Sequence, residues 1–359
     1  MTTITQVQVK KDNLSETRVT THDTGPLGDG DVLTKVDRFS ITANNVTYGV
    51  VGERIGYWKF FPVADDGWGI IPVWGFADVI ESKNPDVPVG DRLYGYWPMA
   101  DHLVISPTKV KATRLIDGAA HRAELPPVYN SYSRVKAEPH YDPAMENDRA
   151  VLMPLYMTSF CLYDFSLDNN WFDAQQVVIP SASSKTAIGT AYAFKTDNAS
   201  PRLIGLTSSR NKSAVDALNL YDETFVYEDI ENIGDKPTLI IDMSGNGSIL
   251  GRLHKHLGTN MKFTSNVGVT HYDDNKMSAD FIRDRSAMFF APGHIQKRAS
   301  DWGPGEFEKK AGAFFHGAAM SSRNWLTIKH ERGTKAITNA WHDVLEGKTP
   351  ANESWVVGV

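Results

Sequence analysis

Cysteine is nearly absent from this sequence: Cys161 is the single one among 359 residues. One cysteine cannot form an internal disulfide framework or a cysteine-rich zinc module. The sequence also has no run of about 18 uninterrupted apolar residues, the length that a membrane-spanning helix needs. An excess of basic charge is missing too, because 37 Lys+Arg stand against 43 Asp+Glu and leave a net charge of −6. This balance argues against nucleic acid as the main partner.

The first residues lack the pattern of an export signal. Residues 1–11 alternate polar residues with Ile4, Val7 and Val9, which is typical of a strand and not of a basic segment followed by an apolar one. We therefore expect a soluble, cytoplasmic protein that binds neither membrane nor nucleic acid.

The pattern of turns and apolar residues divides the chain. Residues 1 to about 110 read as short strands between Gly, Pro and Asp turns, which favours a small barrel or sandwich. Residues 111–150 are polar and proline-containing, and we interpret them as a long loop that is either functional or a linker. Residues 152–164 are apolar at helical spacing and predict a buried helix.

From residue 177 onwards, short apolar runs alternate with helical stretches. Such alternation predicts crossover units and a doubly wound parallel α/β sheet. A helix at about 334–345 and a strand at 355–359 are expected to follow it. The six apolar runs are 177–180, 202–207, 225–227, 237–244, 262–270 and 287–291.

The turn after the first of these strands lacks the glycines of a dinucleotide-binding loop. Ala182, Ser184 and Ala187 occupy the spacing of G-x-G-x-x-G, and these small residues still permit a tight turn. A plain turn without ligand is one alternative. A phosphate-binding P-loop is another, but positions 179 and 184 are Ile and Ser instead of Gly. The residues expected to contact a pyrophosphate are Ser181, Ala182, Ser183, Ser184, Lys185, Thr186 and Ala187.

The end of the second strand has no acidic residue for the ribose 2′-hydroxyl of NAD. It carries hydroxyls and bases, which suit a 2′-phosphate, so the sequence predicts NADP(H) as cofactor. The alternative is a helix cap with solvated basic side chains. The residues in question are Thr207, Ser208, Ser209, Arg210 and Lys212.

Taken together, several segments resemble the medium-chain dehydrogenase/reductase superfamily in their order and spacing. These are residues 30–36, 88–93, 177–189, 205–212, 240–245 and 289–292. The resemblance implies an α/β protein with a GroES-like β-barrel catalytic domain, residues 1–150 and 300–359, and a Rossmann domain, residues 151–299. It also implies a homodimer. The cofactor contacts that it adds are Lys212 and Tyr227 near the 2′-phosphate, and Asp242, Met243, Ser244, Phe290 and Ala291.

Residues 74–78 read Trp-Gly-Phe-Ala-Asp where zinc alcohol dehydrogenases have a Gly-His-Glu motif. The chain also lacks their cysteines and has no histidine pattern of a metal site, so we expect no metal. It is more similar to the zinc-independent quinone- and enoyl-reductase branch. Within that branch, residues 42–48 and 183–187 resemble a bacterial family described only as a domain of unknown function.

Without a metal, the substrate oxygen must be polarised by a hydrogen-bond donor. The resemblance makes Tyr48 the first catalytic candidate and Asn45 the second, because a Tyr near this position can donate a proton in enoyl reductases. The alternative is that residues 42–45 form a simple turn.

Ten aromatic residues lie between positions 57 and 97. Core packing explains some of them, but the run Trp-Lys-Phe-Phe does not alternate like a strand, and part of the cluster could line an apolar substrate cleft. The 111–150 loop could cover that cleft. The predicted substrate contacts are Tyr57, Trp58, Phe60, Phe61, Tyr129 and Tyr132.

These observations predict an NADP(H)-dependent, zinc-independent oxidoreductase. It would act on a carbonyl or an activated C=C bond of an apolar or aromatic small molecule. Two alternatives stay open: a non-catalytic NADPH-binding sensor or partner protein, and a non-redox enzyme that has lost dinucleotide binding.

Overall fold

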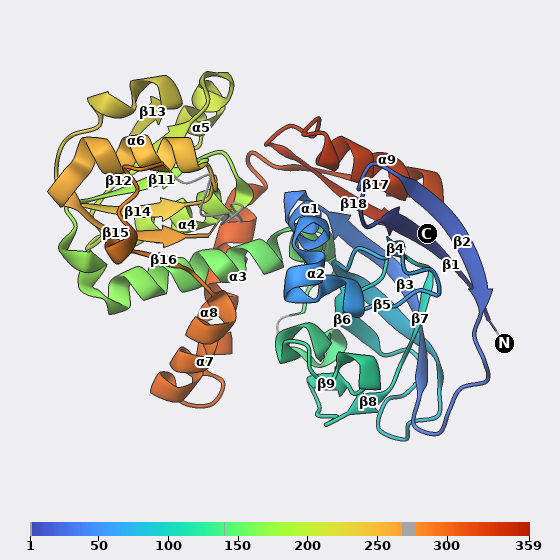
Figure 1. The fold of residues 1–359 in the computed structure, drawn as a ribbon. Coiled ribbons are helices and arrows are strands. Elements are labelled where there is room, and N and C mark those ends of the chain that lie inside the picture. The colour runs from blue at the N-terminus through green and yellow to red at the C-terminus, as the bar shows by residue number, and fades with distance from the viewer. Residues whose placement is uncertain (1, 140, 268–277) are drawn as a thin grey trace. The chain divides into compact units, whose positions relative to one another are not determined.

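The computed structural model describes residues 2–139, 141–267 and 278–359. These residues form two compact units (Figure 1): unit 1 contains residues 1–151 and 326–359, and unit 2 contains residues 152–325. The second boundary differs from the predicted one at residue 300. The segment 300–325, which we had assigned to the catalytic domain, lies in unit 2, because its helix α8 (Glu306–Ser322) packs on helices of that unit.

Unit 1 is built mainly on antiparallel strands, and its one parallel pair among the described residues is β17 with β18. A three-stranded sheet has the order β2-β1-β4, and a nine-stranded sheet has the order β17-β18-β3-β5-β6-β10-β9-β8, with β7 paired to β3. The strands of the first sheet are β1 (Thr3–Lys10), β2 (Thr17–Asp23) and β4 (Trp68–Gly69). Those of the second are β3 (Val32–Ile41), β5 (Val73–Ser82), β6 (Arg92–Trp97), β7 (His102–Ile105), β8 (Pro107–Thr108), β9 (Arg114–Asp117), β10 (Ser131–Arg134), β17 (Thr327–Arg332) and β18 (Glu353–Gly358).

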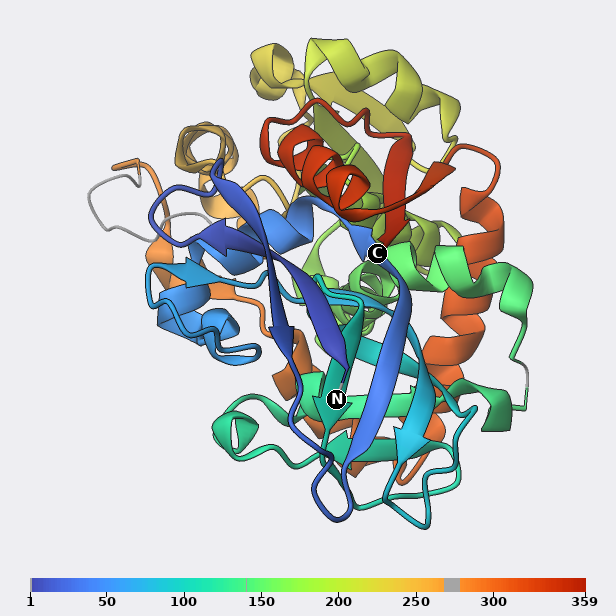
Figure 2. The ribbon, with the colours of Figure 1, turned by 90° about the vertical axis from the view of Figure 1, so that its right-hand side faces the viewer.

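Segments far apart in the sequence pair in the larger sheet. The C-terminal strand β18 pairs with β3, and Figure 2 shows the red strand beside the blue one. The predicted helix at 334–345 is α9 (Thr334–Leu345), whose buried Ile337 and Trp341 face the core of unit 1. The Trp341 indole N–H donates to the Leu14 carbonyl oxygen at 2.8 Å. The short helices α1 (Ala43–Val50) and α2 (Gly52–Ile55) follow β3.

The interpretation of residues 111–150 as one long loop is wrong. The segment contains β9 and β10, and β10 pairs with both β6 and β9. It also contains short 3-10 turns, among them Pro127–Asn130. Its polar side chains and prolines hid these strands, because short strands of four residues give little periodicity to read. Part of the loop that we expected to cover the substrate cleft therefore belongs to the large sheet of unit 1.

Unit 2 is a doubly wound parallel sheet of the order β13-β12-β11-β14-β15-β16, the order of nucleotide-binding domains. Its strands are β11 (Gln176–Pro180), β12 (Arg202–Thr207), β13 (Glu223–Val226), β14 (Thr238–Asp242), β15 (Met261–Asn266) and β16 (Ser286–Met288). The six predicted apolar runs coincide with these strands, except that residues 268–270 of the fifth lie outside the described residues.

Helices cover both faces of this sheet. Val177 and Ile179 pack against α3 (Glu146–Asp168) and α4 (Lys185–Lys195), whereas Val178 on the opposite face packs against α6 (Gly247–Leu257). The remaining helices are α5 (Lys212–Ala217), α7 (Ala291–Trp302) and α8. Since both faces are covered, the strands read as continuous apolar runs.

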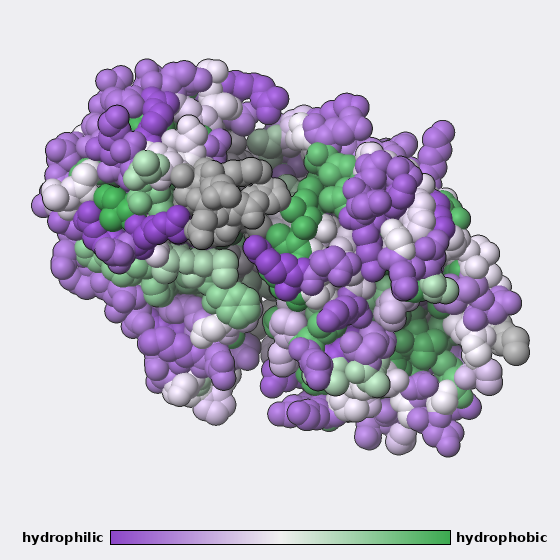
Figure 3. Space-filling view, viewed as in Figure 1, coloured by the Kyte–Doolittle hydropathy of each residue, from purple (hydrophilic) through white to green (hydrophobic). Residues whose placement is uncertain are grey.

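Helix α3 contains the predicted buried helix 152–164 and extends it at both ends. Its segment with the preceding turn, Pro143–Asp168, is long and apolar enough to cross a membrane by length and composition, and 56% of its most apolar 18-residue stretch is buried inside the structure. A core helix passes the same test. The surface seen in Figure 3 is mostly hydrophilic, with apolar patches between the purple areas.

Candidate functional site

The turn after β11 is held in an unusual backbone conformation. Ser181 has a φ of 60°, a region that favours glycine. Its backbone N–H donates to the Tyr227 hydroxyl at 3.1 Å, and the next N–H, of Ala182, donates to the Leu206 carbonyl oxygen. Neighbouring strands therefore supply the partners that keep the turn in shape without a glycine.

Two further side chains clamp the same turn. The Tyr221 hydroxyl donates to the Ala182 carbonyl oxygen at 3.0 Å, and the Asn211 amide donates to the Ser183 hydroxyl at 3.0 Å. The room for this approach comes from Gly205 on β12, where a Cβ would stand 3.1 Å from the Ala182 Cβ. The glycine that permits close packing thus lies on the neighbouring strand, which explains how a loop without glycines can keep a tight turn.

Helix α4 begins directly behind the turn. Ser184 is its N-cap, and its hydroxyl accepts from the Ala187 backbone N–H at 3.3 Å. The other predicted loop residues, Lys185 and Thr186, form the first turn of α4. A helix N-terminus that follows the central strand of a doubly wound sheet is the ordinary place for a phosphate group.

Basic side chains follow β12 at the same edge. Thr207 is buried, whereas Arg210 is exposed and makes no ion pair within the part of the chain that the structure describes. Lys212 is already paired with Asp216 at 2.8 Å, one helical turn further on. Ser208 and Ser209 lead into a short 3-10 turn. The Tyr227 hydroxyl accepts the hydrogen bond from the Ser181 N–H, so Tyr227 contacts the loop.

The end of β14 supplies a buried carboxylate. Asp242 accepts hydrogen bonds from the Ser244 N–H and hydroxyl and from the Gly245 N–H, and burial raises its pKa. Met243 is half-buried beside it. Phe290, 57% exposed, and Ala291 stand at the start of α7 after β16, which is the edge strand of the sheet. The first three predicted groups thus follow β11, β12 and β14 directly, and the fourth lies at the sheet's far side.

Unit 1 contains a cluster of tyrosine hydroxyls around Tyr48. The Tyr48 hydroxyl accepts from the Asn44 amide at 2.7 Å and from the Trp74 indole N–H at 3.3 Å. Both groups donate to the phenolic oxygen, so neither of them takes the Tyr48 proton. Burial, and next the neighbouring Tyr57, raise the pKa of Tyr48 well above its usual value. Tyr48 is therefore a neutral hydrogen-bond donor at physiological pH.

Three further tyrosines complete this cluster. The hydroxyls of Tyr57 and Tyr129 lie 3.1 Å apart, and the Tyr96 ring is 4.7 Å from that of Tyr129. Tyr96 is fully buried, and its hydroxyl has no hydrogen-bond partner of ordinary geometry among the described residues. Burial, followed by the nearby Tyr48 hydroxyl, raises the pKa of Tyr96 as well. The cluster presents neutral hydroxyls and aromatic rings.

Asn45 and Tyr132 do not belong to this cluster. The Asn45 side chain accepts from the Thr42 N–H and donates to the Pro72 carbonyl oxygen, so it caps α1. Tyr132 is fully buried, and its hydroxyl donates to the Tyr96 carbonyl oxygen and accepts from Arg122. The hydrogen bonds of both residues stabilise the fold of unit 1, so we assign neither a catalytic nor a substrate-binding role to them.

Among the aromatic residues predicted to contact substrate, Trp58, Phe60 and Phe61 are core residues. Each is at most 6% exposed. The Trp58 ring lies against Gly52 and Gly69, where a Cβ would come within 2.5 Å of it. The buried Arg122 guanidinium lies over the Phe60 and Phe61 rings, and Phe60 also packs beneath the tyrosine cluster, 5.1 Å from the Tyr96 ring. Tyr57 and Tyr129 remain, because they share the hydroxyl pair described above.

Sequence reasoning missed several contacts of these two groups, among them Tyr221, which binds the Ala182 carbonyl oxygen. Asn44 lies four residues before Tyr48, which is the spacing of neighbours on a helix face, so a helix at 43–50 would have identified it. Trp74 and Tyr96 belong to the aromatic enrichment but had no individual signal. Asn211 lies between Arg210 and Lys212, and only the folded chain shows that it reaches Ser183. Among the described residues, no group of three or more His, Cys, Asp or Glu side chains could hold a metal ion.

Solved structures share this architecture over the full chain. CurA from Vibrio vulnificus in complex with NADPH aligns with a TM-score of 0.63 at 13% identity, covering 98% of each chain. The quinone oxidoreductase from Coxiella burnetii gives 0.59 at 14% identity and covers 100% of both. The Etr1p/NADP/crotonyl-CoA complex gives 0.59 at 10%, covering 99% of this chain and 100% of that one. No curated protein matches the sequence.

These likenesses establish the fold. The barrel-like unit 1 and the doubly wound unit 2 are those of medium-chain dehydrogenases/reductases, which confirms the predicted fold class and resemblance. Within this class, the family model "Protein of unknown function (DUF2855)" matches residues 39–350. The chain belongs to that family, as the residues 42–48 and 183–187 had indicated.

Proposed function

We propose that this protein is an NADP(H)-dependent oxidoreductase that works without a metal ion. The observation that carries the proposal is the edge of the unit 2 sheet, where the clamped turn of residues 181–187 and Arg210, which has no ion-pair partner among the described residues, follow adjacent strands. The fold is shared with proteins solved in complex with NADPH or NADP, which supports the choice of cofactor.

The residues at this edge fit two charged groups of NADPH, the pyrophosphate and the 2′-phosphate of the adenosine. The first N–H groups of α4, with the hydroxyls of the turn, would bind the pyrophosphate. Arg210 would pair with the 2′-phosphate, because a guanidinium matches phosphate geometry and here has no competing acid. Bound NADPH supplies a hydride at its nicotinamide ring.

The tyrosine cluster of unit 1 fits the other requirement of the reaction. A carbonyl or an activated C=C bond that accepts hydride needs a hydrogen-bond or proton donor for its oxygen or carbanion. We assign this role to Tyr48, because Asn44 and Trp74 both donate to its oxygen and neither takes its proton. Aromatic rings and neutral hydroxyls suit an uncharged apolar or aromatic substrate, with Tyr57 and Tyr129 as further contacts.

Cofactor specificity tests the proposal. NADPH should bind at least about tenfold more tightly than NADH, measured by fluorescence or calorimetric titration, and Arg210→Ala should remove most of this preference. The matched control is Arg202→Ala, which removes an exposed arginine from the opposite end of β12, where it pairs with Glu223. Equal dissociation constants for the two cofactors, or an unchanged ratio in Arg210→Ala, would contradict the proposal.

Turnover separates an enzyme from a binding protein of the same fold. Loss of NADPH absorbance at 340 nm should appear with some quinones, enones or aromatic aldehydes. Tight NADPH binding with no consumption across such a panel would instead favour the sensor or partner role. Mass spectrometry of the purified protein would identify any retained cofactor.

We further propose that the protein is a cytoplasmic homodimer. Among the described residues, strand β16 forms one edge of the unit 2 sheet, and its last residue, Met288, is 66% exposed. A second copy could cover this apolar edge. Light scattering should give twice the monomer mass of 39.8 kDa, and Met288→Glu should shift it towards one copy. The single cysteine, Cys161, is buried, and burial raises the pKa of its thiol, so the fold needs no oxidising compartment.

A further inference from the structure

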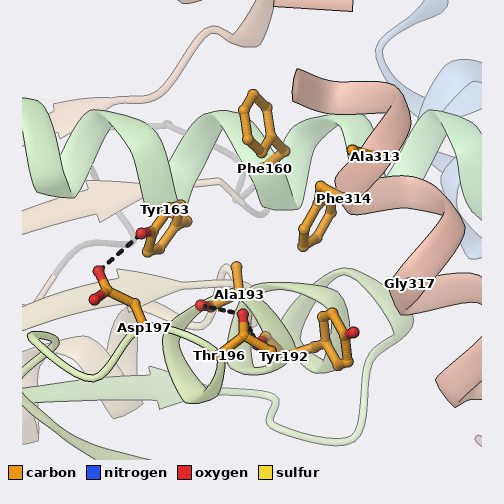
Figure 4. Close-up of a pocket in the computed structure, with 9 residues that line it drawn as sticks. All are labelled: Phe160, Tyr163, Tyr192, Ala193, Thr196, Asp197, Ala313, Phe314 and Gly317. Carbon is orange, nitrogen blue, oxygen red and sulfur yellow. Dashed lines mark hydrogen bonds between the residues drawn. The ribbon is translucent and has the colours of Figure 1, made fainter. Parts of the chain in front are cut away.

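Unit 2 has a second pocket that the proposed cofactor site does not use. It has a volume of about 290 Å³ and lies between α3, α4 and α8 (Figure 4). This volume is near the lower end of the usual range for small-molecule sites, about 300–1,000 Å³. The pocket residues of α4 belong to its last turn, whereas the first turn of α4 carries the phosphate-binding loop. The two sites therefore lie at opposite ends of one helix.

Aromatic rings from three helices line this pocket. Phe160 and Tyr163 come from α3, Tyr192 from α4 and Phe314 from α8. The Phe314 ring centroid is 5.5 Å from that of Phe160 and 6.1 Å from that of Tyr192. Four rings around a small volume offer π-faces to an occupant.

A glycine on α8 makes this arrangement possible. A Cβ at Gly317 would stand 2.8 Å from the Tyr192 hydroxyl oxygen, so the ring reaches this wall because the residue has no side chain. Gly312, on the same helix, would place its Cβ in open space. Of these two α8 glycines, only Gly317 is needed for the shape of the pocket.

One end of the pocket carries a carboxylate without a cation. Asp197 accepts from the Tyr163 hydroxyl at 2.8 Å on one oxygen and from the Ala199 N–H at 2.9 Å on the other. Within the described ranges, no Lys, Arg or His pairs with it. A carboxylate has about four acceptor positions, so these two bonds leave capacity for a further donor. Among the described residues, therefore, no cationic side chain pairs with the carboxylate beside the rings.

We propose that this pocket binds a small organic cation, of the arylalkylammonium type, with its ammonium group on Asp197 and its apolar body between the rings. A cation is attracted both by the carboxylate and by the aromatic faces. A neutral molecule lacks both of these charge attractions, and an anion is repelled by the carboxylate. The site takes a ligand of a different charge from the phosphates expected at the other end of α4.

Titration with phenethylammonium, observed by saturation-transfer NMR and calorimetry on the full chain, tests the inference. Saturable binding is expected, with at least about tenfold weaker binding of the neutral isostere 2-phenylethanol. Asp197→Asn keeps the shape of the side chain and one acceptor oxygen but removes the charge. It should weaken binding of phenethylammonium about tenfold and leave binding of 2-phenylethanol unchanged.

Filling the pocket gives an independent check. Gly317→Leu should abolish phenethylammonium binding, whereas Gly312→Leu should retain it, with thermal unfolding confirming that both variants fold. Equal binding of the ammonium and the alcohol would overturn the proposal, and so would full affinity in Asp197→Asn or Gly317→Leu. NADPH titration of the same variants keeps this result separate from the cofactor proposal.

Discussion

Tyr48 illustrates how the acceptors and donors around one hydroxyl define its chemistry. Two N–H groups point at its oxygen, and one of them, the Trp74 indole, can only donate. The hydroxyl proton is thus left for a different partner.

Removing this hydroxyl should separate chemistry from cofactor binding. Tyr48→Phe should lower kcat by about a hundredfold or more, since a positioned proton donor contributes that much, while the dissociation constant of NADPH stays the same. Steady-state kinetics and NADPH titration measure the two quantities. Tyr94→Phe is the control, because the Tyr94 hydroxyl makes only a long 3.4 Å bond to the Arg149 carbonyl oxygen. Undiminished kcat in Tyr48→Phe would exclude the assigned role.

His254 on α6 has its protonation state set by two hydrogen bonds. Its Nδ1 accepts from the Ile282 N–H at 2.8 Å, so its Nε2 carries the proton and donates to the Thr264 hydroxyl at 3.0 Å. Burial, with Arg285 nearby, lowers its pKa to about 4. The folded state holds a neutral imidazole.

The stability of unit 2 should therefore depend on pH. The unfolded chain takes up a proton at about pH 6.5, so the stabilisation is complete above that pH and is lost as the pH falls towards 4. The full difference is about 3 kcal/mol. Urea denaturation between pH 7.5 and 4.5 should show this loss, and His254→Gln should flatten it, whereas His22→Gln on the exposed β2 should not. An equally steep loss in His254→Gln would show that other groups cause it.

At the scale of elements, the loop between β11 and α4 replaces glycines by contacts from its neighbours. Tyr221, Tyr227 and Asn211 each bind one residue of the turn, and Gly205 gives it room. Ser181 still bears the strain of its left-handed conformation, which costs a residue with a Cβ about 1 kcal/mol.

Restoring the glycine should relieve this strain. Ser181→Gly is expected to raise the free energy of unfolding by up to about 1 kcal/mol, reduced by the larger backbone entropy of glycine in the unfolded chain, and to leave NADPH affinity intact. Asn219→Gly is the matched control in unit 2, because asparagine at φ 54° tolerates that conformation. Chemical denaturation compares them, and a clear destabilisation by Ser181→Gly would contradict the strain argument.

At the scale of the whole molecule, one ion-pair network joins distant parts of the sequence within unit 1. Arg92 on β6 binds Asp37 on β3, Asp78 on β5 and Glu146 at the start of α3. Arg332 on β17 also binds Asp37. Burial opposes the ionisation of Asp37 and Glu146, but the hydrogen bonds from arginine outweigh it and hold both pKa values below their usual range.

This network should stabilise unit 1 at neutral pH and weaken in acid. Carboxylates with lowered pKa contribute stability that is present above their unfolded pKa, about 4, and is lost as the pH falls below it. Arg92→Met should cost about 3 kcal/mol at pH 7, because it removes the arginine that three carboxylates share and leaves Asp37 and Glu146 with weaker pairing to Arg38 and Arg332. The cost should be smaller at pH 3. Arg114→Met, on the exposed end of β9, should change stability by no more than about 0.5 kcal/mol. Equal losses for the two variants in thermal or urea unfolding would refute this reading.

Local patterns in the sequence were sufficient to predict unit 2. Strands β11, β12 and β14 are covered on both faces, so each appears as an uninterrupted apolar run that needs no knowledge of its partners. The helix α9 was likewise readable from its own periodicity. Edge strand β17 was missed because five of its six residues are polar or charged and four of them are exposed at its end.

The sequence by itself determined the fold class, the position of the tight turn after β11 and the absence of an acid directly after β12, because all three follow from residues adjacent in the chain. Only the tertiary structure decided which side chains meet. Tyr129 joins the hydroxyl cluster while Tyr132, three residues later, is buried in the sheet. Asn44 binds Tyr48 while Asn45 caps the helix. Hydrogen bonds depend on the direction of each side chain and on segments far apart in sequence, and residue types alone carry neither.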